Sequence, residues 1–219
     1  MSELLDLNPD DLLSTTRAVR KRLDLSRAVE PELVRECISM AAQAPTGGNA
    51  QGWHFVVVTD PDKRRQLGEW YRAAYEMFYG DRVAALADPP SADESPAAAT
   101  ERRVVTSSAY LAEHMGEVPV HVIPVIQGRM DGTPGSMQAA FWGSLLPAVW
   151  SFCLAARARG LGTCWTTLHL MNEKDAAELL GIPVDYSQGA LIPVAHTLGT
   201  DFRPGPRRDL TPIIHTNTW

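Results

Sequence analysis

The chain has 219 residues, of which 45% are hydrophobic and 21% are charged, and it carries a formal net charge of -6. This size fits one domain with one sizeable core, and the acidic balance argues against a general nucleic-acid-binding surface. The acidic first residues lack the apolar block of a secretory signal, so we predict a cytoplasmic protein.

Histidine and cysteine residues do not form the clusters that metal sites or disulfide frameworks need. The three cysteines, Cys37, Cys153 and Cys164, are widely spaced, and the six histidines are scattered. No H-E-x-x-H or C-x-x-C motif occurs in the sequence. We therefore predict reduced thiols and no metal site.

The first third of the chain predicts helices around one buried strand. Trp53–Val58 is a continuous apolar run rich in valine, which is typical of a strand covered on both faces. Glu30 and Asp60 each precede a proline that suits the first helical position. In chain order we predict a helix capped by Asp10 or Asp11, a helix that begins at Pro31 and is ended by Pro45, the strand, and a helix from Pro61 to about Gly80.

Residues 87–100 are dense in Ala, Pro, Ser, Asp and Glu, a composition that supplies no packed core. We predict a mobile insertion around 81–100 within a single domain that spans 1–219. Two interpretations of the insertion remain open, a lid over a bound ligand and a solvated loop.

The second half of the chain predicts two strands and three helices. In chain order we predict a helix from Glu101 to Met115, a strand from Val118 to Ile126, a helix from Gly143 to Arg159, a β-prone segment from Thr163 to Thr167, a helix from Asn172 to Gly181, a strand from Ala190 to Leu198, and an irregular tail from Phe202. Pro124 indicates that its strand lies at a sheet edge or bends, because proline cannot donate to a ladder.

The stretch from Gly132 to Ala156 contains no charged residue and is long enough to cross a membrane. Glycine, serine and proline residues interrupt it, and Arg157 and Arg159 follow it, so we predict a helix buried in protein and no membrane partner. Its apolar residues surround the helix, so either the core of one chain or the interface of a homodimer could cover them.

The segment before the first strand has the composition of a ligand-binding loop. Gly47 and Gly48 allow close backbone approach, while Thr46, Asn49 and Gln51 supply a hydroxyl and two amides. These groups suit the recognition of a flat ligand with alternating donors and acceptors better than they suit acid–base catalysis.

Two arginine clusters lie at opposite ends of the chain, within 17–22 and 203–208. Guanidinium groups bind phosphate through paired hydrogen bonds, and distant segments can combine into one clamp. A solvated basic face is the alternative. Gly160 and Gly162 match half of a dinucleotide-binding motif, but Cys164 and Trp165 follow instead of a further glycine and a helix start, which argues against a Rossmann nicotinamide site.

Four motifs, in this order, resemble the FMN-dependent nitroreductase family: T-T-R-A-V-R, A-P-T-G-G-N-A-Q-G-W-H-F-V-V-V, G-L-G-T-C-W-T-T, and a basic tail. The resemblance covers the chain from Thr15 to Leu210. It implies an α+β fold of three layers, α/β/α, in which helices wrap a mixed, mainly antiparallel sheet. It also implies a homodimer that binds FMN at the subunit interface.

The resemblance also implies roles for particular residues. It implies FMN contacts from Arg17 and Arg20, from Thr46, Gly47, Asn49 and Gln51, from Trp165, Thr166 and Thr167, and from Arg207 or Arg208 at the phosphate. Phe141 and Trp142 are candidates for an aromatic substrate slot, with a core role as the alternative. The chain departs from the family at Ala18, where many relatives have serine, and at Gly52, where they usually have proline.

The function that the resemblance implies is a flavoenzyme that takes electrons from NADH or NADPH and reduces a nitroaromatic or quinone-like acceptor by a ping-pong mechanism. The flavin carries out this chemistry, so we assign no catalytic side chain and interpret His54 and His169 as structural residues or polar contacts. A protein that stores or senses FMN without turnover is the main alternative. A scaffold without flavin is the third interpretation.

Overall fold

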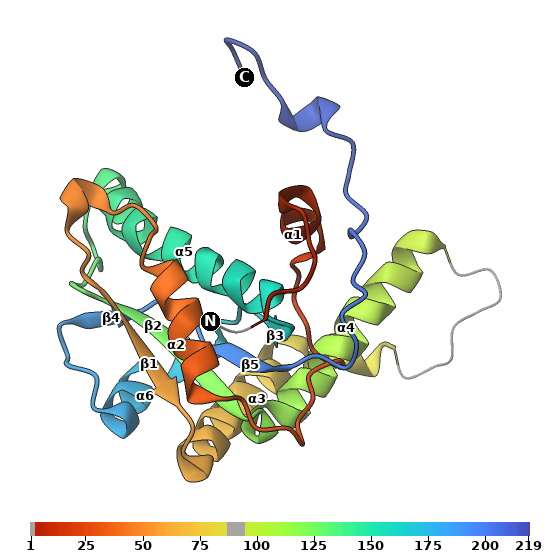
Figure 1. The fold of residues 1–219 in the computed structure, drawn as a ribbon, viewed down its shortest axis with the longest axis horizontal. Helices are drawn as coiled ribbons and strands as arrows, with labels where there is room; N and C mark the ends of the chain where they lie inside the picture. The colour runs from red at the N-terminus through yellow and green to blue at the C-terminus, as the bar shows by residue number, and fades with distance from the viewer. Residues whose placement is uncertain (1–2, 87–94) are drawn as a thin grey trace.

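The computed structural model describes residues 3–86 and 95–219, which form three layers (Figure 1). A five-stranded sheet forms the middle layer, with the order β1-β2-β5-β3 and with β4 paired to β2. The strands are β1 Trp53–Val58, β2 Val120–Gln127, β3 Leu161–Thr163, β4 Tyr186–Gln188 and β5 Ile192–His196. These strands pair antiparallel, and one isolated parallel bridge joins Ala18 to Thr163. The predicted mixed, mainly antiparallel sheet is confirmed.

Helices cover both faces of this sheet in the described residues. The α-helices are α1 Pro9–Thr15, α2 Pro31–Ala41, α3 Pro61–Ala84, α4 Pro96–His114, α5 Gly135–Ala158 and α6 Glu173–Leu180. The short 3-10 helices are η1 Gly47–Asn49, η2 Met115–Glu117, η3 Leu168–Asn172 and η4 Thr211–Ile213.

Proline marks the start of each of the first four α-helices. The predicted starts at Pro31 and Pro61 are confirmed, and the Asp60 carboxylate accepts hydrogen bonds from two backbone N–H groups of α3. The predicted cap of the first helix is wrong, because Asn8 Oδ1 accepts the N–H of Asp11 at 2.8 Å. An asparagine directly before a proline is the stronger N-terminal signal.

Two hydrophobic clusters lie on opposite faces of the sheet. Val122 and Ile126 of β2 pack with residues of α2 and α5, whereas Ile123 and Val125 pack with residues of α3, α4 and α6. Successive side chains of a strand point to opposite faces, so one strand serves both clusters. α2 and α5 therefore form one outer layer and α3, α4 and α6 the other, which confirms the α+β fold with three layers.

Pro124 lies in the central strand β2, so the prediction of an edge strand is wrong. Phe55 of β1 pairs with Pro124 on one side. On the other side β5 pairs with Val120–Val122 and β4 with Val125–Gln127, which leaves Pro124 between the two partner strands. The Pro124 carbonyl accepts a hydrogen bond from Gly189 N at 2.9 Å. The missing N–H of the proline faces this same side, where the ladder is already interrupted.

α3 extends to Ala84 and α4 begins at Pro96, so the predicted insertion around 81–100 is wrong at both of its ends. The Ser95 hydroxyl accepts the N–H of Ala98 at 3.2 Å and starts α4. Proline is favoured at the first position of a helix, so a composition that suggests a loop also suits a helix start. The rest of the predicted insertion, 87–94, lies outside the described residues.

α5 is the predicted apolar helix, and it begins at Gly135, earlier than expected. This helix is long and apolar enough to cross a membrane, and 44% of its most apolar 18-residue segment is buried within the chain. Leu145 and Phe152 are buried in the cluster that α5 shares with α2, whereas Leu146 and Trp150 are 37% and 41% exposed. One chain therefore covers part of α5 and leaves an apolar strip uncovered.

Two further boundaries differ from the prediction, and one strand was not predicted. α2 ends at Ala41, four residues before Pro45. The β-prone segment contributes strand β3 only up to Thr163, and Thr166 forms an isolated antiparallel bridge with Leu191. β4 was not predicted, because a strand of three residues carries too little alternation to detect.

Candidate functional site

The N-terminal arginine segment lies against the start of the C-terminal tail. Arg17 Nη1 donates to the Arg203 carbonyl at 3.1 Å, across a separation of 186 residues. Arg22 Nε donates to the Leu198 carbonyl at 2.8 Å, and Arg22 Nη2 forms an ion pair with Asp201 at 2.6 Å. We call these contacting segments, 17–22 and 198–203, the arginine half of the site.

Arg20 lines a pocket of about 300 Å³ together with Trp165, Thr166 and Thr167. Four of the residues predicted to bind the cofactor therefore lie together. Arg20 Nη1 donates to Ser107 Oγ at 3.3 Å, while the buried Nε has no hydrogen-bond partner in the described chain. A buried guanidinium donor without a partner is costly, and a ligand with an acceptor atom removes that cost.

Three further aromatic residues line the Arg20 pocket and were missed by the sequence analysis. Tyr71, Tyr75 and Tyr79 recur every four residues on α3, a spacing that places them on one helix face. The Tyr75 hydroxyl lies 2.8 Å from Ser108 Oγ, and the Tyr75 and Tyr79 ring centroids are 5.1 Å apart. Burial raises the pKa of Tyr71 above its usual range, so this hydroxyl stays protonated.

The predicted polar loop, Thr46–Gln51, forms the amide half of the site. Gln51 N donates to Thr46 Oγ1 at 3.0 Å, and Gln51 Nε2 donates to Asn49 Oδ1 at 3.0 Å. Asn49 and Gln51 have positive φ values of 56° and 49°, a left-handed conformation that favours glycine. Gly47 N donates to Ser144 Oγ of α5 at 3.0 Å, which attaches the loop to the body of the protein.

The two halves lie at different positions along α5. Ser144 contacts the amide half, whereas Arg157 Nη2 donates to the Thr200 carbonyl of the arginine half at 3.1 Å. At a rise of 1.5 Å per residue these two positions are separated by about 20 Å along the helix axis. A single chain therefore does not combine the loop with the arginines.

Phe141 and Trp142, the candidate substrate residues, lie at the amide end of α5. Their rings meet edge to face with centroids 4.9 Å apart, and both pack against the cluster shared by α2 and α5. Trp142 also lines a separate pocket of about 330 Å³ with Arg129 and Glu173. In one chain this aromatic pair is not part of the Arg20 pocket.

Arg207 and Arg208 lie on an exposed part of the tail, which runs away from the body past α1 (Figure 1). Arg207 Nη1 donates to the neighbouring Pro206 carbonyl at 3.0 Å. The structure therefore places Arg17 beside Arg203, but it does not bring Arg207 or Arg208 into the Arg20 pocket.

The two histidines that we interpreted as structural occupy different environments. Burial lowers the pKa of His169 to about 4, so this side chain is neutral at pH 7. His54 Nε2 lies 3.4 Å from the Tyr186 hydroxyl, away from the Arg20 pocket. Across residues 3–86 and 95–219, no group of three or more His, Cys, Asp and Glu side chains could hold a metal ion.

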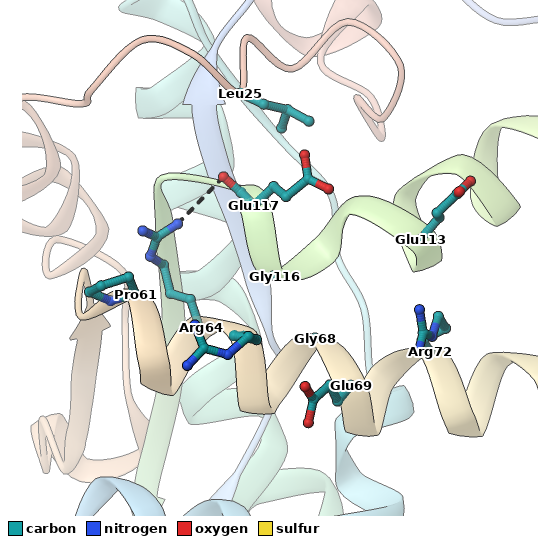
Figure 2. Close-up of a pocket in the computed structure, with 10 residues that line it drawn as sticks. Leu25, Pro61, Arg64, Gly68, Glu69, Arg72, Glu113, Gly116 and Glu117 are labelled. Carbon is teal, nitrogen blue, oxygen red and sulfur yellow. Dashed lines mark hydrogen bonds between the residues drawn. The ribbon is translucent and has the colours of Figure 1, made fainter.

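A larger pocket, of about 630 Å³, lies where α3 crosses η2 (Figure 2). A Cβ on Gly68 would lie 2.5 Å from Gly116 N, so glycine permits this crossing. Arg64 Nη1 donates to the Glu117 carbonyl at 3.4 Å, and arginine side chains of α3 and glutamate side chains of α3, α4 and η2 line the pocket. The mixed charges favour no one class of ligand, and the residues predicted to bind a cofactor do not line it. We therefore place the candidate site at the smaller pocket.

The fold and the Arg20 pocket together define an α+β protein of the nitroreductase type. Residues 13–196 match the Nitroreductase family, and the chain belongs to this family. The resemblance inferred from the four motifs is thereby confirmed.

Individual relatives differ in what their names describe. The chain is 27% identical over 203 residues to protein DrgA of Synechocystis sp. (strain ATCC 27184 / PCC 6803 / Kazusa), covering 92% of this chain and 89% of DrgA. It is 24% identical over 204 residues to the putative NAD(P)H nitroreductase YodC of Bacillus subtilis (strain 168), covering 93% and 95%. The structure of oxidized iodotyrosine deiodinase bound to FMN and 3-iodo-L-tyrosine matches with a TM-score of 0.67 at 20% identity, covering 95% of this chain and 98% of that one. This last likeness shows the fold.

Proposed function

We propose that this protein is an FMN-dependent oxidoreductase that uses NADH or NADPH to reduce a nitroaromatic or quinone-like acceptor by a ping-pong mechanism. The observation that carries the proposal is the Arg20 pocket, where a buried donor without a partner lies beside Trp165–Thr167. Membership of the Nitroreductase family supports the proposal. So does the name of the putative NAD(P)H nitroreductase YodC, 95% of whose length this chain covers.

The polar groups of this chain fit the chemistry of FMN, which carries a phosphate and a flat ring edged with donors and acceptors. Arg17 and the arginines of the tail, Arg207 and Arg208 among them, would hold the phosphate. Trp165–Thr167 would lie against the ring, and the exposed amides of Thr46–Gln51 would bind its edge. The positive φ values in that loop support this role, because backbone strain clusters at binding sites.

The proposal includes a homodimer in which each copy supplies its amide half to the Arg20 pocket of the other. The separation of the halves along α5 supports this arrangement, and so does the uncovered apolar strip with Leu146 and Trp150. Phe141 and Trp142 would then approach the partner's pocket together with the loop. We also propose a cytoplasmic location, which the free and buried Cys37 supports.

Bound FMN would supply two-electron chemistry, accepting hydride from the nicotinamide and passing it to the acceptor. Arg20 would provide positive charge that stabilises the added electrons, and Thr167 would offer a hydrogen-bond donor at the ring edge. Tyr71 and Tyr75 would form the wall that keeps water from the pocket. These roles require no side chain that changes protonation state, which agrees with the neutral His169.

The first test is an absorbance spectrum of the purified protein followed by anaerobic stopped-flow mixing with NADH and with NADPH. Bleaching of the flavin band faster than that of free FMN, and its return on adding a nitroaromatic or a quinone, is the expected result. Arg20→Met serves as the matched variant and should lose most of the bound flavin. A yellow protein with no bleaching above the free-flavin rate would support FMN storage or sensing instead. A protein without affinity for FMN contradicts both functions.

A further inference from the structure

Arg157, near the end of α5, is a buried arginine with incomplete hydrogen bonding. Its side chain is 4% exposed, and Nη2 donates to Thr15 Oγ1 at 3.2 Å and to the Thr200 carbonyl at 3.1 Å. Nε and Nη1 are buried without a partner, and Arg157 forms no ion pair with any described carboxylate. Burial and the nearby Arg22 lower the pKa of Arg157, yet a guanidinium stays charged at pH 7. The protein therefore keeps an uncompensated positive charge in its interior.

Phe202 lies between this buried charge and a second guanidinium. The Arg157 Cζ atom lies 4.9 Å from the centroid of the Phe202 ring, and the Arg22 Cζ atom lies 4.2 Å from it. Cations interact favourably with the face of an aromatic ring, so one ring holds two like charges near each other. We call Arg22, Arg157 and Phe202 the clasp. Only Arg22 has a carboxylate partner, Asp201.

The clasp fixes the chain directly before the tail arginines. Arg22 binds the Leu198 carbonyl, Arg157 binds the Thr200 carbonyl, and Phe202 precedes Arg203, whose own carbonyl accepts from Arg17. Arg157 therefore contacts both segments of the chain that lead into the arginine pair: Thr15 precedes Arg17 by two residues, and Thr200 precedes Arg203 by three. Salt screens a buried charge much less than it screens an exposed one.

A methionine of similar length would fill the Arg157 position without a desolvation cost. Replacing buried charges by apolar residues is often neutral or stabilising, so retaining an unpaired arginine works against stability. Positions where a chain breaks its own packing rules are commonly positions that serve function. Here the function would be to add positive charge to a site that receives an anion.

We propose that the clasp selects the phosphorylated form of the ligand: Arg157 adds an uncompensated charge behind the Arg17 site, and Phe202 holds the tail in place. This inference rests on the proposed FMN function. Neither residue touches the ligand: Arg157 acts through its charge, and Phe202 is a positioning residue that acts through the tail.

The test compares dissociation constants for FMN and for riboflavin, which has the same ring and ribityl chain but no phosphate. Arg157→Met should weaken FMN binding about tenfold and leave riboflavin binding unchanged, because only the phosphate interacts with the lost charge. Its melting temperature should equal or exceed that of the natural protein. Arg157→Lys keeps the charge and should retain most of the preference for FMN.

Phe202 provides a second, independent series. Phe202→Leu keeps the apolar bulk but removes the aromatic face, so it should lower the FMN preference, and Phe202→Tyr should restore it. Arg65→Met is the matched control, because it removes one exposed charge at the start of α3 and should leave both affinities unchanged. If Arg157→Met does not fold, the Phe202 series decides the question.

Two results would overturn the inference. In the first, Arg157→Met and Phe202→Leu both keep the FMN-to-riboflavin affinity ratio of the natural protein. In the second, both variants lose affinity for FMN and for riboflavin by the same factor, which indicates a general loss of structure at the site. A natural protein that binds neither flavin would instead refute the proposed function itself. A natural protein that binds both equally refutes the clasp while leaving a flavin-dependent function intact.

Discussion

The arginine half of the site joins segments from opposite ends of the chain, whereas the amide half, Thr46–Gln51, is built from residues within five positions of one another. The first depends on the complete fold, since 186 residues separate Arg17 from Arg203. The second depends on local backbone geometry and on one anchor, Ser144. Neither half makes a complete site by itself, and their separation along α5 supports the proposed homodimer.

Removing the tail arginines should produce the largest effect. Arg207→Ala combined with Arg208→Ala should weaken FMN binding at least about a hundredfold, because each charge-assisted hydrogen bond lost costs about 1.5 to 3 kcal/mol. Isothermal titration of the apoprotein measures this change. Unchanged affinity would mean that the tail takes no part in binding the phosphate, in one chain or in a dimer.

A mixing experiment sharpens the same comparison. Arg207→Ala/Arg208→Ala breaks one half of each site and Asn49→Ala/Gln51→Ala breaks the other, so neither homodimer should retain FMN. After unfolding and refolding the two variants together, about a quarter of the sites should recover, because each mixed dimer contains one intact site. Absence of recovery would place both halves of each site in the same chain.

Acidification should affect the body that supports the arginine half. Burial lowers the pKa of His121 and of His169 to about 4, against an ordinary value of 6.5. As the pH falls below 6.5, these histidines bind protons in the unfolded state but not yet in the folded state. The free energy of unfolding therefore falls between pH 6.5 and 4, whereas above pH 6.5 these two groups change it little. The loss should be about 2 kcal/mol per histidine between pH 6.5 and 5.

The checking measurement is urea unfolding at a series of pH values. His121 Nε2 lies 2.8 Å from the Met115 carbonyl and therefore donates to it, and the amide of His121→Gln can preserve this bond. That variant should show about half of the natural pH dependence. An unchanged slope would mean that His121 binds protons equally in the folded and unfolded states.

Ser144→Ala should loosen the amide half by a smaller amount. Gly47 N loses its acceptor, and a net hydrogen bond contributes about 1 kcal/mol. Hydrogen exchange at Gly47 should become faster, while the arginine half keeps its protection. Equal protection of Gly47 in both proteins would show that the loop does not depend on α5.

Gln51→Gly should produce the smallest change in stability, and unlike Ser144→Ala it should stabilise the protein. Its positive φ of 49° is strained for glutamine, so glycine should raise the free energy of unfolding by about 0.5 to 1 kcal/mol. The lost amide should at the same time weaken FMN binding. Asn49→Gly is the matched control, because asparagine tolerates this conformation better and should yield a smaller gain. Equal gains would indicate that the strain is not specific to Gln51.

The accuracy of the sequence-based predictions depended on how local each signal was. The bounds of the strand Trp53–Val58 and the helix starts at Pro31 and Pro61 are confirmed, because a run of valines or a cap followed by proline acts over a few residues. The predicted burial of that strand on both faces is wrong, because β1 lies at the edge of the sheet and only its Val58 is buried. The edge-strand interpretation of Pro124 is wrong, since the place of this proline between β4 and β5 depends on strand order. The three tyrosines of α3 were visible as a four-residue repeat but could not be assigned to a pocket.

By itself, the sequence determined the family, the order of the α-helices and of most strands, and the residue types of each half of the site. These follow from caps, periodicity and residue types, which act over one or two turns of chain. Only the tertiary structure decided that Arg20 meets Trp165–Thr167, that Phe202 lies between two guanidinium groups, and that α5 keeps the two halves apart. Such contacts join residues far apart in the chain, and they form because the sheet and its two hydrophobic clusters must close together.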